Sequence, residues 1–182
     1  LLADSTNAQN PGYTPSEAIV SKSLMSAYAD AKGRIILATF ASNVSRIQMA
    51  VDAAVANKRK VCVFGRSMVN VVGIAQELGY LKAPEGTFIE PEELGHYRDD
   101  RLCILTTGSQ GEPMAGLSRM ADGSHRQVQI HAGDTVIISA SPIPGNETSV
   151  GRTIDSLMRL GAHVVTSTTT RVHVSGHGSQ ED

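Results

Sequence analysis

The sequence predicts a three-layer α/β domain in which helices cover both faces of a mostly parallel, Rossmann-like sheet. Short apolar runs alternate with amphipathic helical segments along the 182 residues, which is the pattern of repeated βαβ units. Aromatic residues form 4% of the chain, so Val, Ile, Leu and Ala must supply the core, as they do in strands buried on both faces. Almost every predicted strand is followed by Ser, Thr, Gly or Asn, and such strand tips meet at one edge of a parallel sheet.

The bulk composition is that of one soluble domain that is large enough for its own core. The net charge of −2 excludes a strongly basic nucleic-acid binder, although it permits a local phosphate site. We expect no membrane association, because no apolar run approaches the roughly 18 residues of a membrane span and no signal peptide opens the chain. Cys62 and Cys103 lie in apolar runs and are predicted to be buried free thiols, which indicates a reducing compartment such as the cytoplasm.

The first part of the chain is predicted to contain three strands, each followed by a helix. Gly33 ends the first helix, and the run from 34 to 40 is the clearest strand of the sequence. The helix after that strand has apolar residues spaced three to four apart, which indicates one buried face. The expected elements are a strand at 1–3, a helix at about 16–32, a strand at 34–40, a helix at 44–55, a strand at 61–64 and a helix at 68–78.

The second part of the chain continues this alternation after a less regular stretch at 80–100. Pro91 stands at the first position of a brief helix, where proline is common. Gly161 ends the last long helix, and a β-branched run then leads into the C-terminal segment. The expected elements are a short edge strand at 88–89, a brief helix from 91, a strand at 101–106, a helix at 114–120, a short strand and turn at 125–133, a strand at 135–139, a helix at 148–160 and a strand at 163–165.

Three strand tips have the composition of an anion-binding site. Ser42 and Asn43 lie at a strand tip and a helix N-terminus together, which favours an anion, although a plain N-cap would explain them without a ligand. Arg66 follows another strand and is interpreted either as a phosphate clamp or as an ordinary surface residue. The segment 107–113 has the glycines and hydroxyls of a phosphate cradle, but it is no Walker A motif because no Lys-Ser or Lys-Thr pair follows.

The last ten residues, 173–182, form the segment best suited to proton transfer. His173 and His177 flank a Ser-Gly step, and a histidine among small residues can exchange a proton with a closely approaching ligand near neutral pH. Near the other end of the chain, Asp4 follows the predicted strand at 1–3. Its carboxylate either points into a site at the sheet edge or caps the turn after it, and the sequence leaves both interpretations open.

Six blocks of the sequence together point to one protein family. The blocks are Leu2–Asn7, Thr39–Asn43, Gly65–Met68, Thr106–Met114, Ser139–Asn146 and His173–Ser179. In this order they resemble bacterial ribonuclease J, a family of metallo-β-lactamase-fold nucleases that carry a β-CASP domain. The resemblance covers the chain from its first residue to its last, and it implies that residues 1–182 are a β-CASP domain cut from a longer chain. The metallo-β-lactamase core and the C-terminal domain of the family are absent from this sequence.

The resemblance implies catalytic roles for Asp4 and His177, which fall on the family's motif A acid and motif B histidine. In the family the acid orients the histidine at the active-site cleft, where the histidine is a candidate general acid for the leaving oxygen or a stabiliser of the scissile phosphate. The family's dinuclear metal site uses a His-x-His-x-Asp-His run and further ligands, none of which occurs here. The resemblance therefore implies that the parent enzyme binds two divalent metal ions, with zinc as the expected metal. It also implies that this fragment binds no metal and does not cleave RNA by itself.

The resemblance also implies that this domain holds the 5′-terminal nucleotides of single-stranded RNA with a 5′-monophosphate. Hydroxyls and glycine amides suit one terminal phosphate, because such a group needs directional donors rather than a broad basic field. The residues expected to bind RNA or phosphate are Ser42, Asn43, Val44, His173, Val174, Ser175, Gly176 and His177, together with Arg66, Ser67, Ser109 and Ser141. The resemblance implies that the parent enzyme is both a 5′–3′ exoribonuclease and an endoribonuclease. It is expected to act in RNA processing and decay in the cytoplasm, including the processing of rRNA, and to form a homodimer or a homotetramer.

Two other functions are compatible with the pattern of strands and helices. The first is a stand-alone α/β module that binds a nucleotide or a phosphorylated metabolite without catalysis. The abrupt ends of the chain, at a buried strand and at an uncapped Gly-Ser-Gln-Glu-Asp segment, favour the nuclease fragment over this module. The second is a phosphotransferase with Asp4 as its nucleophile, which is disfavoured because Thr6 stands where a second aspartate is needed.

Overall fold

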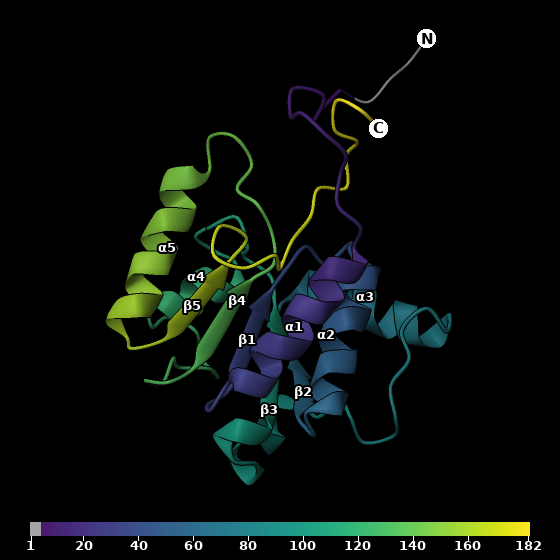
Figure 1. Ribbon diagram of the computed structural model, residues 1–182. Helices are drawn as coiled ribbons and strands as arrows, with labels where there is room; N and C mark the ends of the chain where they lie inside the picture. Colours follow the sequence, from purple (N-terminus) through teal and green to yellow (C-terminus); the bar gives the residue numbers. More distant parts are fainter. Residues whose placement is uncertain (1–4) are drawn as a thin grey trace.

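A five-stranded parallel sheet forms the centre of the fold (Figure 1). The computed structural model describes residues 5–182, so the expected strand at 1–3 and Asp4 lie outside the described residues. The strands are β1 (Ile35–Ala38), β2 (Lys60–Val63), β3 (Leu102–Thr106), β4 (Thr135–Ile138) and β5 (His163–Thr166). They are arranged in the order β2-β3-β1-β4-β5, and each neighbouring pair is parallel.

Helices cover both faces of this sheet and produce the three layers that the sequence predicts (Figure 1). The helices are α1 (Ala18–Asp30), α2 (Val44–Ala56), α3 (Arg66–Glu77), α4 (Gly116–Ala121) and α5 (Glu147–Arg159), with short 3₁₀ helices η1 (Pro91–His96) and η2 (Asp99–Arg101). The first three α-helices lie on one face, and α4 and α5 lie on the other. Within residues 5–182, no helix has the length and apolar character that crossing a membrane requires.

Successive residues of each strand face the two helical layers in turn, because side chains alternate across a strand. Ile35 and Leu37 of β1 pack with α1, α2 and α3, whereas Ile36 and Ala38 pack on the side of α4 and α5. All four side chains are fully buried. This burial on both faces explains why the strands read as continuous apolar runs rather than as alternating patterns.

The segment 125–133 forms no strand, so the prediction of a short strand there is wrong. The buried ring of His125 packs edge-on against Phe64, with 5.2 Å between the ring centres. The Nδ1 atom of His125 accepts a hydrogen bond from the backbone N–H of Val128 at 3.1 Å, and its carbonyl oxygen accepts one from the Gln129 side chain at 2.9 Å. These local bonds satisfy polar groups within a turn, so Val128 reaches the core without a sheet partner.

The edge strand expected at 88–89 is reduced to a single bridge. Phe88 pairs with Val61 of β2 in the parallel sense. The N–H of Ile89 donates to the carbonyl of Val61 at 2.9 Å, and the N–H of Val61 donates to the carbonyl of Thr87 at 2.9 Å. This bridge occupies the outer edge of β2, which limits the unpaired backbone on that side of the sheet.

Both cysteines are buried free thiols, as the sequence predicts. Cys62 and Cys103 are each 0% exposed. Burial raises the pKa of the Cys62 thiol to about 12. Burial also raises the pKa of Cys103 to about 11, although the Tyr28 hydroxyl, 3.3 Å from its sulfur, lowers that pKa in part. Because the thiolate is the reactive form of cysteine, both side chains are inert in the folded chain.

We expect neither thiol to react with a thiolate-selective reagent at about pH 8 in the folded chain, and both to react in denaturant. Both pKa values are raised above the ordinary 9.0, so the stability that the protonated thiols contribute is fully present below pH 9 and is lost as the pH rises through 11 to 12. Timed labelling with and without denaturant measures the first effect, and urea unfolding at increasing alkaline pH measures the second. Rapid labelling of either thiol without denaturant would contradict the prediction.

Candidate functional site

A cavity of about 1120 Å³ opens at the carboxyl edge of the sheet. Four stretches of chain line it: the loop before α1, the loop between β1 and α2, the loop between β4 and α5, and the segment 173–179 after β5. Three of these stretches follow the carboxyl ends of parallel strands, where ligands bind in α/β sheets. The cavity therefore lies at the edge where the sequence pattern predicts a ligand.

Most of the residues predicted to bind RNA line this one cavity. Ser42, Asn43 and Val44 come from the junction of β1 and α2, and Ser141 comes from the loop between β4 and α5. All residues of the stretch 173–177 line it as well. The fold thus brings together side chains from three parts of the sequence that lie far apart along the chain.

Three other predicted binding residues, Arg66, Ser67 and Ser109, do not line the cavity. Arg66 and Ser67 are exposed in the first turn of α3, which begins two residues earlier than the sequence predicts. This helix follows β2, and β2 is the edge strand farthest from β5. Ser109 is only 3% exposed, because the chain after β3 packs against α5. Sheet order therefore separates Arg66 and Ser67 from the cavity, and burial separates Ser109.

Asn43 is the N-cap of α2. Its side-chain oxygen accepts a hydrogen bond from the backbone N–H of Arg46 at 3.0 Å, which confirms the capping interpretation for this residue. Ser42 precedes the cap, is exposed and lines the cavity. The 13 residues of α2 place the positive end of their aligned peptide dipoles beside Ser42. The N-cap of α2 and an anion-binding site are therefore compatible, because Asn43 forms the cap and Ser42 remains free to face the cavity.

The C-terminal segment is held by the N-terminal loop. The hydroxyl of Thr14 donates to the carbonyl of His177 at 3.0 Å, and the N–H of Ser179 donates to the Thr14 hydroxyl at 2.9 Å. The N–H of Gln180 donates to the carbonyl of Asn10 at 2.9 Å. Figure 1 shows the two segments side by side above the carboxyl edge of the sheet. This pairing positions His177 at the cavity although the segment contains no helix or strand.

The cavity is rich in hydrogen-bond donors and poor in charge. Among the described residues that line it, there is no lysine or arginine, and Glu17 is the single acidic side chain. The Glu17 carboxylate is already bound by Arg46, whose Nη2 lies 2.6 and 2.7 Å from its two oxygens. Hydroxyls, side-chain amides and backbone N–H groups are directional donors, which suit a single phosphate group.

One part of the cavity wall is apolar. Phe40 and Ile143 line it with 36% and 51% of their surface exposed, and a proline stands on each side of Ile143. The buried side chain of Gln110 holds this wall, since its Oε1 accepts from the N–H of Ile143 at 2.7 Å and its Nε2 donates to the carbonyl of Ser141 at 2.9 Å. The segment 107–113, predicted as a phosphate cradle, thus supports the neighbouring loop through Gln110. An apolar wall beside polar donors suits a ligand with a base and a phosphate.

Arg46 is a buried residue behind the cavity that the sequence pattern did not reveal. It is 0% exposed in the first turn of α2, although arginine is ordinarily a surface residue. Its Nη1 donates to the hydroxyl of Ser139 at 2.6 Å and to the carbonyl of Val172 at 3.0 Å. One signal could have found it: Arg46, Ala50 and Ala53 share one helix face, and a charge on an otherwise apolar face indicates a buried partner.

The described residues contain one cluster with the composition of a metal site, formed by Asp99, His131 and Asp134. It precedes β3 and β4 at the amino edge of the sheet, opposite the cavity. Both carboxylate oxygens of Asp134 are bound by Arg34, at 3.0 and 2.6 Å. Two remaining side chains do not make a dinuclear centre, so the described residues do not fit the metal site that the resemblance implies for the parent enzyme.

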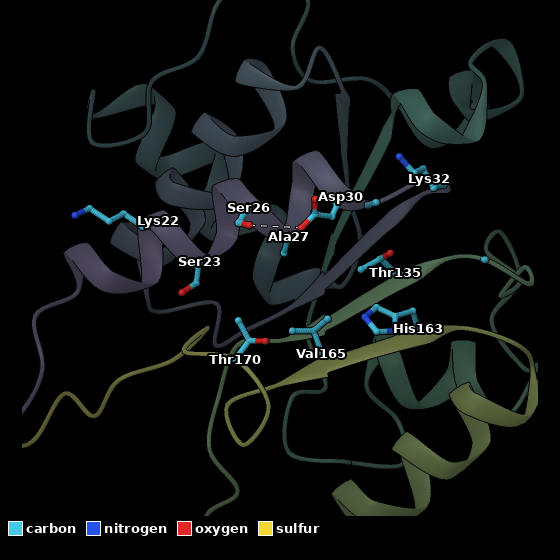
Figure 2. A pocket seen from close by; sticks show the side chains of 12 residues that line it. Lys22, Ser23, Ser26, Ala27, Asp30, Lys32, Thr135, His163, Val165 and Thr170 are labelled. Carbon is cyan, nitrogen blue, oxygen red and sulfur yellow. Dashed lines mark hydrogen bonds between the residues drawn. The ribbon is translucent and has the colours of Figure 1, made fainter.

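A second cavity, of about 720 Å³, lies between α1 and the edge strand β5 (Figure 2). Figure 2 shows Ser23 and Ala27 of α1 on one side of this space and His163 and Val165 of β5 on the other. Within residues 5–182, none of the residues predicted from the sequence to bind RNA or to act in catalysis lines it. It is the space that α1 leaves over the edge strand, and we assign no ligand to it.

These features define a class of protein: a Rossmann-like α/β domain with a donor-lined cavity at the carboxyl edge of its sheet. Residues 32–157 match the family described as "Ribonuclease J, beta-CASP domain". The chain belongs to this family, which confirms the resemblance carried by the six sequence blocks.

The names of similar proteins agree with this family. The chain is 50% identical over 182 residues to Ribonuclease J 1 of Streptococcus pyogenes serotype M3, an alignment that covers 100% of this chain and 32% of that protein. It is 52% identical over 178 residues to Ribonuclease J of Corynebacterium glutamicum, covering 98% of this chain and 25% of that protein. It is 48% identical over 182 residues to Ribonuclease J2 of Bacillus subtilis, covering 100% and 33%. The chain thus spans at most about a third of the length of these relatives.

Proposed function

We propose that this chain is the RNA-binding β-CASP part of a longer, metal-dependent ribonuclease J. In that protein it binds the 5′-monophosphate end of single-stranded RNA and supplies Asp4 and His177 to the active-site cleft. The names of the relatives support an RNA substrate and a nuclease reaction for the longer protein. Its metallo-β-lactamase core, with two zinc-type ions, and its C-terminal domain belong to the remainder of that protein.

One observation carries this proposal: the two stretches that the resemblance assigns to RNA, 42–44 and 173–177, line the same cavity. Its volume of about 1120 Å³ is slightly above the roughly 300–1,000 Å³ of small-molecule sites, which leaves room for a terminal nucleotide and part of its neighbour. The donors suit a phosphate, and the wall around Phe40 and Ile143 suits a base. A concentrated set of donors without a basic track favours the end of a strand over its interior.

The proposed roles of Ser42, Gly176 and His177 follow from their places at the cavity, and that of Asp4 follows from the resemblance alone. The hydroxyl of Ser42 and the N-terminal amides of α2 bind the terminal phosphate, and the backbone at Gly176 approaches it closely because no Cβ intervenes. His177 donates a proton to the leaving oxygen, and Asp4 orients its ring. Cleavage thus needs the longer protein, whereas binding of the phosphate does not.

The wider role of the longer protein is proposed from the resemblance and from the names of the relatives. It degrades RNA from the 5′ end and also cleaves internally, in cytoplasmic RNA processing and decay that includes rRNA. Its active form is a homodimer or a homotetramer. Each of these properties belongs to the whole protein rather than to this chain.

Uridine 5′-monophosphate is expected to bind this chain, and uridine is not, because the phosphate contributes most of the contacts. An NMR titration should show saturable shifts of the His177 ring and of the amides of Ser42, Asn43 and Gly176. A 5′-phosphorylated RNA oligonucleotide should bind more tightly than the mononucleotide. This difference in affinity distinguishes an RNA-binding domain from a stand-alone module that binds a single nucleotide. Equal shifts with uridine, or none at these positions, would contradict a phosphate site in this chain.

The Ser42→Ala variant should weaken mononucleotide binding about tenfold or more, because a hydrogen bond to a charged group contributes about 1.5–3 kcal/mol. Ser42 is the better target than Asn43, whose loss would also remove the N-cap of α2. Ser67→Ala is the matched control, since Ser67 is an exposed serine at another strand tip and lies outside the cavity. Unchanged affinity in Ser42→Ala would count against the proposed binding mode.

A further inference from the structure

Arg46 and His173 make a contact that decides which ring nitrogen of the histidine carries the proton. The Nη1 atom of Arg46 lies 3.3 Å from Nδ1 of His173. A guanidinium group offers only N–H donors and stays charged at any ordinary pH, so Nδ1 must be the acceptor. A ring nitrogen that accepts a hydrogen bond has no proton, and the neutral ring therefore carries its proton on Nε2.

The surroundings of Arg46 hold its guanidinium in the position that this contact needs. Nη2 binds both carboxylate oxygens of Glu17, at 2.6 and 2.7 Å, and Nη1 donates to the hydroxyl of Ser139 at 2.6 Å. The same Nη1 lies 3.0 Å from the carbonyl of Val172. Its two hydrogens are therefore shared among the Ser139 hydroxyl, this carbonyl and Nδ1 of His173, so it holds the backbone directly before His173 as well as the ring. Movement of this buried group would leave Glu17 and Ser139 without their ion pair and hydrogen bond, which is costly.

Burial and charge also favour the neutral form of His173. Burial lowers the pKa of His173, Arg46 lowers it further, and the Glu17 carboxylate raises it only in part. A second proton on the ring would turn an N–H toward the guanidinium and abolish the contact with Arg46. His173 is one of the residues that line the cavity, so an uncharged N–H donor is what its ring can offer to a ligand there.

We propose that Arg46 is a positioning residue that fixes His173 as the neutral Nε2–H tautomer, so that His173 gives the cavity one N–H donor for a phosphate oxygen and takes no part in proton transfer. The inference rests on the phosphate-binding function proposed above. It separates the two histidines of the terminal segment by role. His173 binds phosphate, and His177 is the histidine that transfers a proton.

The tautomer is tested by the ring-nitrogen shifts of His173, measured by long-range ¹H–¹⁵N NMR on the chain without ligand. At neutral pH we expect Nδ1 in the range of an unprotonated nitrogen and Nε2 in the range of a protonated one. His131 is the internal control, because its Nδ1 lies 3.2 Å from a carboxylate oxygen of Asp99 and is expected to carry the proton. A proton on Nδ1 of His173, alone or together with one on Nε2, would overturn the proposal.

The part played by the guanidinium is tested by Arg46→Lys. Lysine keeps the positive charge, but its single ammonium group cannot hold Glu17 and the Nδ1 of His173 at once. We expect His173 to show a mixture of tautomers in this variant, while the amide spectrum of the sheet core stays the same. An unchanged nitrogen pattern would remove Arg46 from the positioning role. If the variant does not fold, the pattern of the unsubstituted chain still decides the tautomer.

Two variants of His173 test the contact with phosphate. A glutamine amide nitrogen can occupy the position of Nε2, whereas an asparagine amide reaches only the position of Nδ1. With uridine 5′-monophosphate, His173→Gln should bind within about threefold of the unsubstituted chain, and His173→Asn about tenfold or more weakly. Equal loss or equal retention in the two variants would overturn the donor role. If the unsubstituted chain does not bind the mononucleotide, the proposed function fails, and the ring-nitrogen pattern still gives a separate result for Arg46.

Discussion

The Gly111→Ala variant is expected to lower the free energy of unfolding by about 3 kcal/mol or more. Gly111 has a φ of +70°, in the left-handed region that side chains of L residues disfavour. A Cβ atom at this position would lie 2.5 Å from the carbonyl carbon of Ser149, and 2.7 Å from its oxygen and from the nitrogen of Val150. These atoms are backbone of α5 and cannot rotate away as a side chain can. The loop or the helix must therefore shift within a packed interior.

The same substitution is expected to weaken nucleotide binding. Gln110, the residue before Gly111, holds the apolar wall of the cavity through its bonds to Ile143 and Ser141. A shift of the backbone at position 111 moves Gln110 and loosens that wall. The mononucleotide titration therefore links the packing of α5 to the candidate site.

Gly151→Ala is the matched control in the same helix. A Cβ atom at Gly151 would meet nothing within 4 Å, and alanine favours the helix over glycine by about 0.5–1 kcal/mol. This variant should therefore be slightly more stable than the unsubstituted chain. Urea unfolding followed by circular dichroism measures both variants under the same conditions. A Gly111→Ala variant as stable as Gly151→Ala would mean that the loop and α5 do not pack as described.

The Asp134→Ala variant is expected to lower the free energy of unfolding by about 3–5 kcal/mol. Arg34 and Asp134 are 6% and 1% exposed, and they form two hydrogen bonds of 3.0 and 2.6 Å. The Asp134 carboxylate also accepts the N–H of His131 at 2.7 Å. Its removal leaves a buried guanidinium whose remaining hydrogen bond goes to the uncharged carbonyl of Gln129, at 2.6 Å. An uncompensated buried charge is the reason for the large expected effect.

Two further variants show whether the effect depends on burial and on the unpaired charge. Arg98 pairs with Asp100 at 3.1 Å, but the Arg98 side chain is 85% exposed, so Arg98→Ala should change the stability by less than about 0.5 kcal/mol. Combining Asp134→Leu with Arg34→Met removes both charges at once and should recover much of the loss. Thermal and urea unfolding of the set measure these differences. A loss below about 1 kcal/mol in Asp134→Ala would show that the buried pair does not stabilise the fold in the expected way.

The regular elements were predictable because their signals are local. Continuous apolar runs bounded by Gly, Ser or Asn predicted β1 to β5 within one or two residues at each end, and the apolar face of α2 was clear from its spacing. The segment 125–133 was mispredicted for the same reason, since Val128 and Ile130 alternate with polar residues, and this local pattern looks alike in a strand and in a turn. What made it a turn is the buried ring of His125 and its bonds to neighbouring backbone and side-chain groups, which no periodicity reveals.

The candidate site was predictable only in part. Ser42, Asn43 and the stretch 173–177 follow strands, so their common edge could be inferred from the parallel pattern, and they do line one cavity. Arg66 also follows a strand, yet it lies apart, because the order of strands in the sheet is set by long-range packing and not by order in the chain. Arg46 was missed because an arginine in a helix is most often a surface residue.

By itself, the sequence determined the fold class, the layers, the strand tips and the family, since each depends on residue patterns that can be read along the chain. Only the tertiary structure decided which tips share a cavity, which glycine contacts the backbone of another helix, and which charge is buried beneath the site. Arg46 shows the physical reason. Its partners Glu17, Ser139 and His173 lie in three separate parts of the chain, and their contacts arise only when the packed sheet brings those parts together.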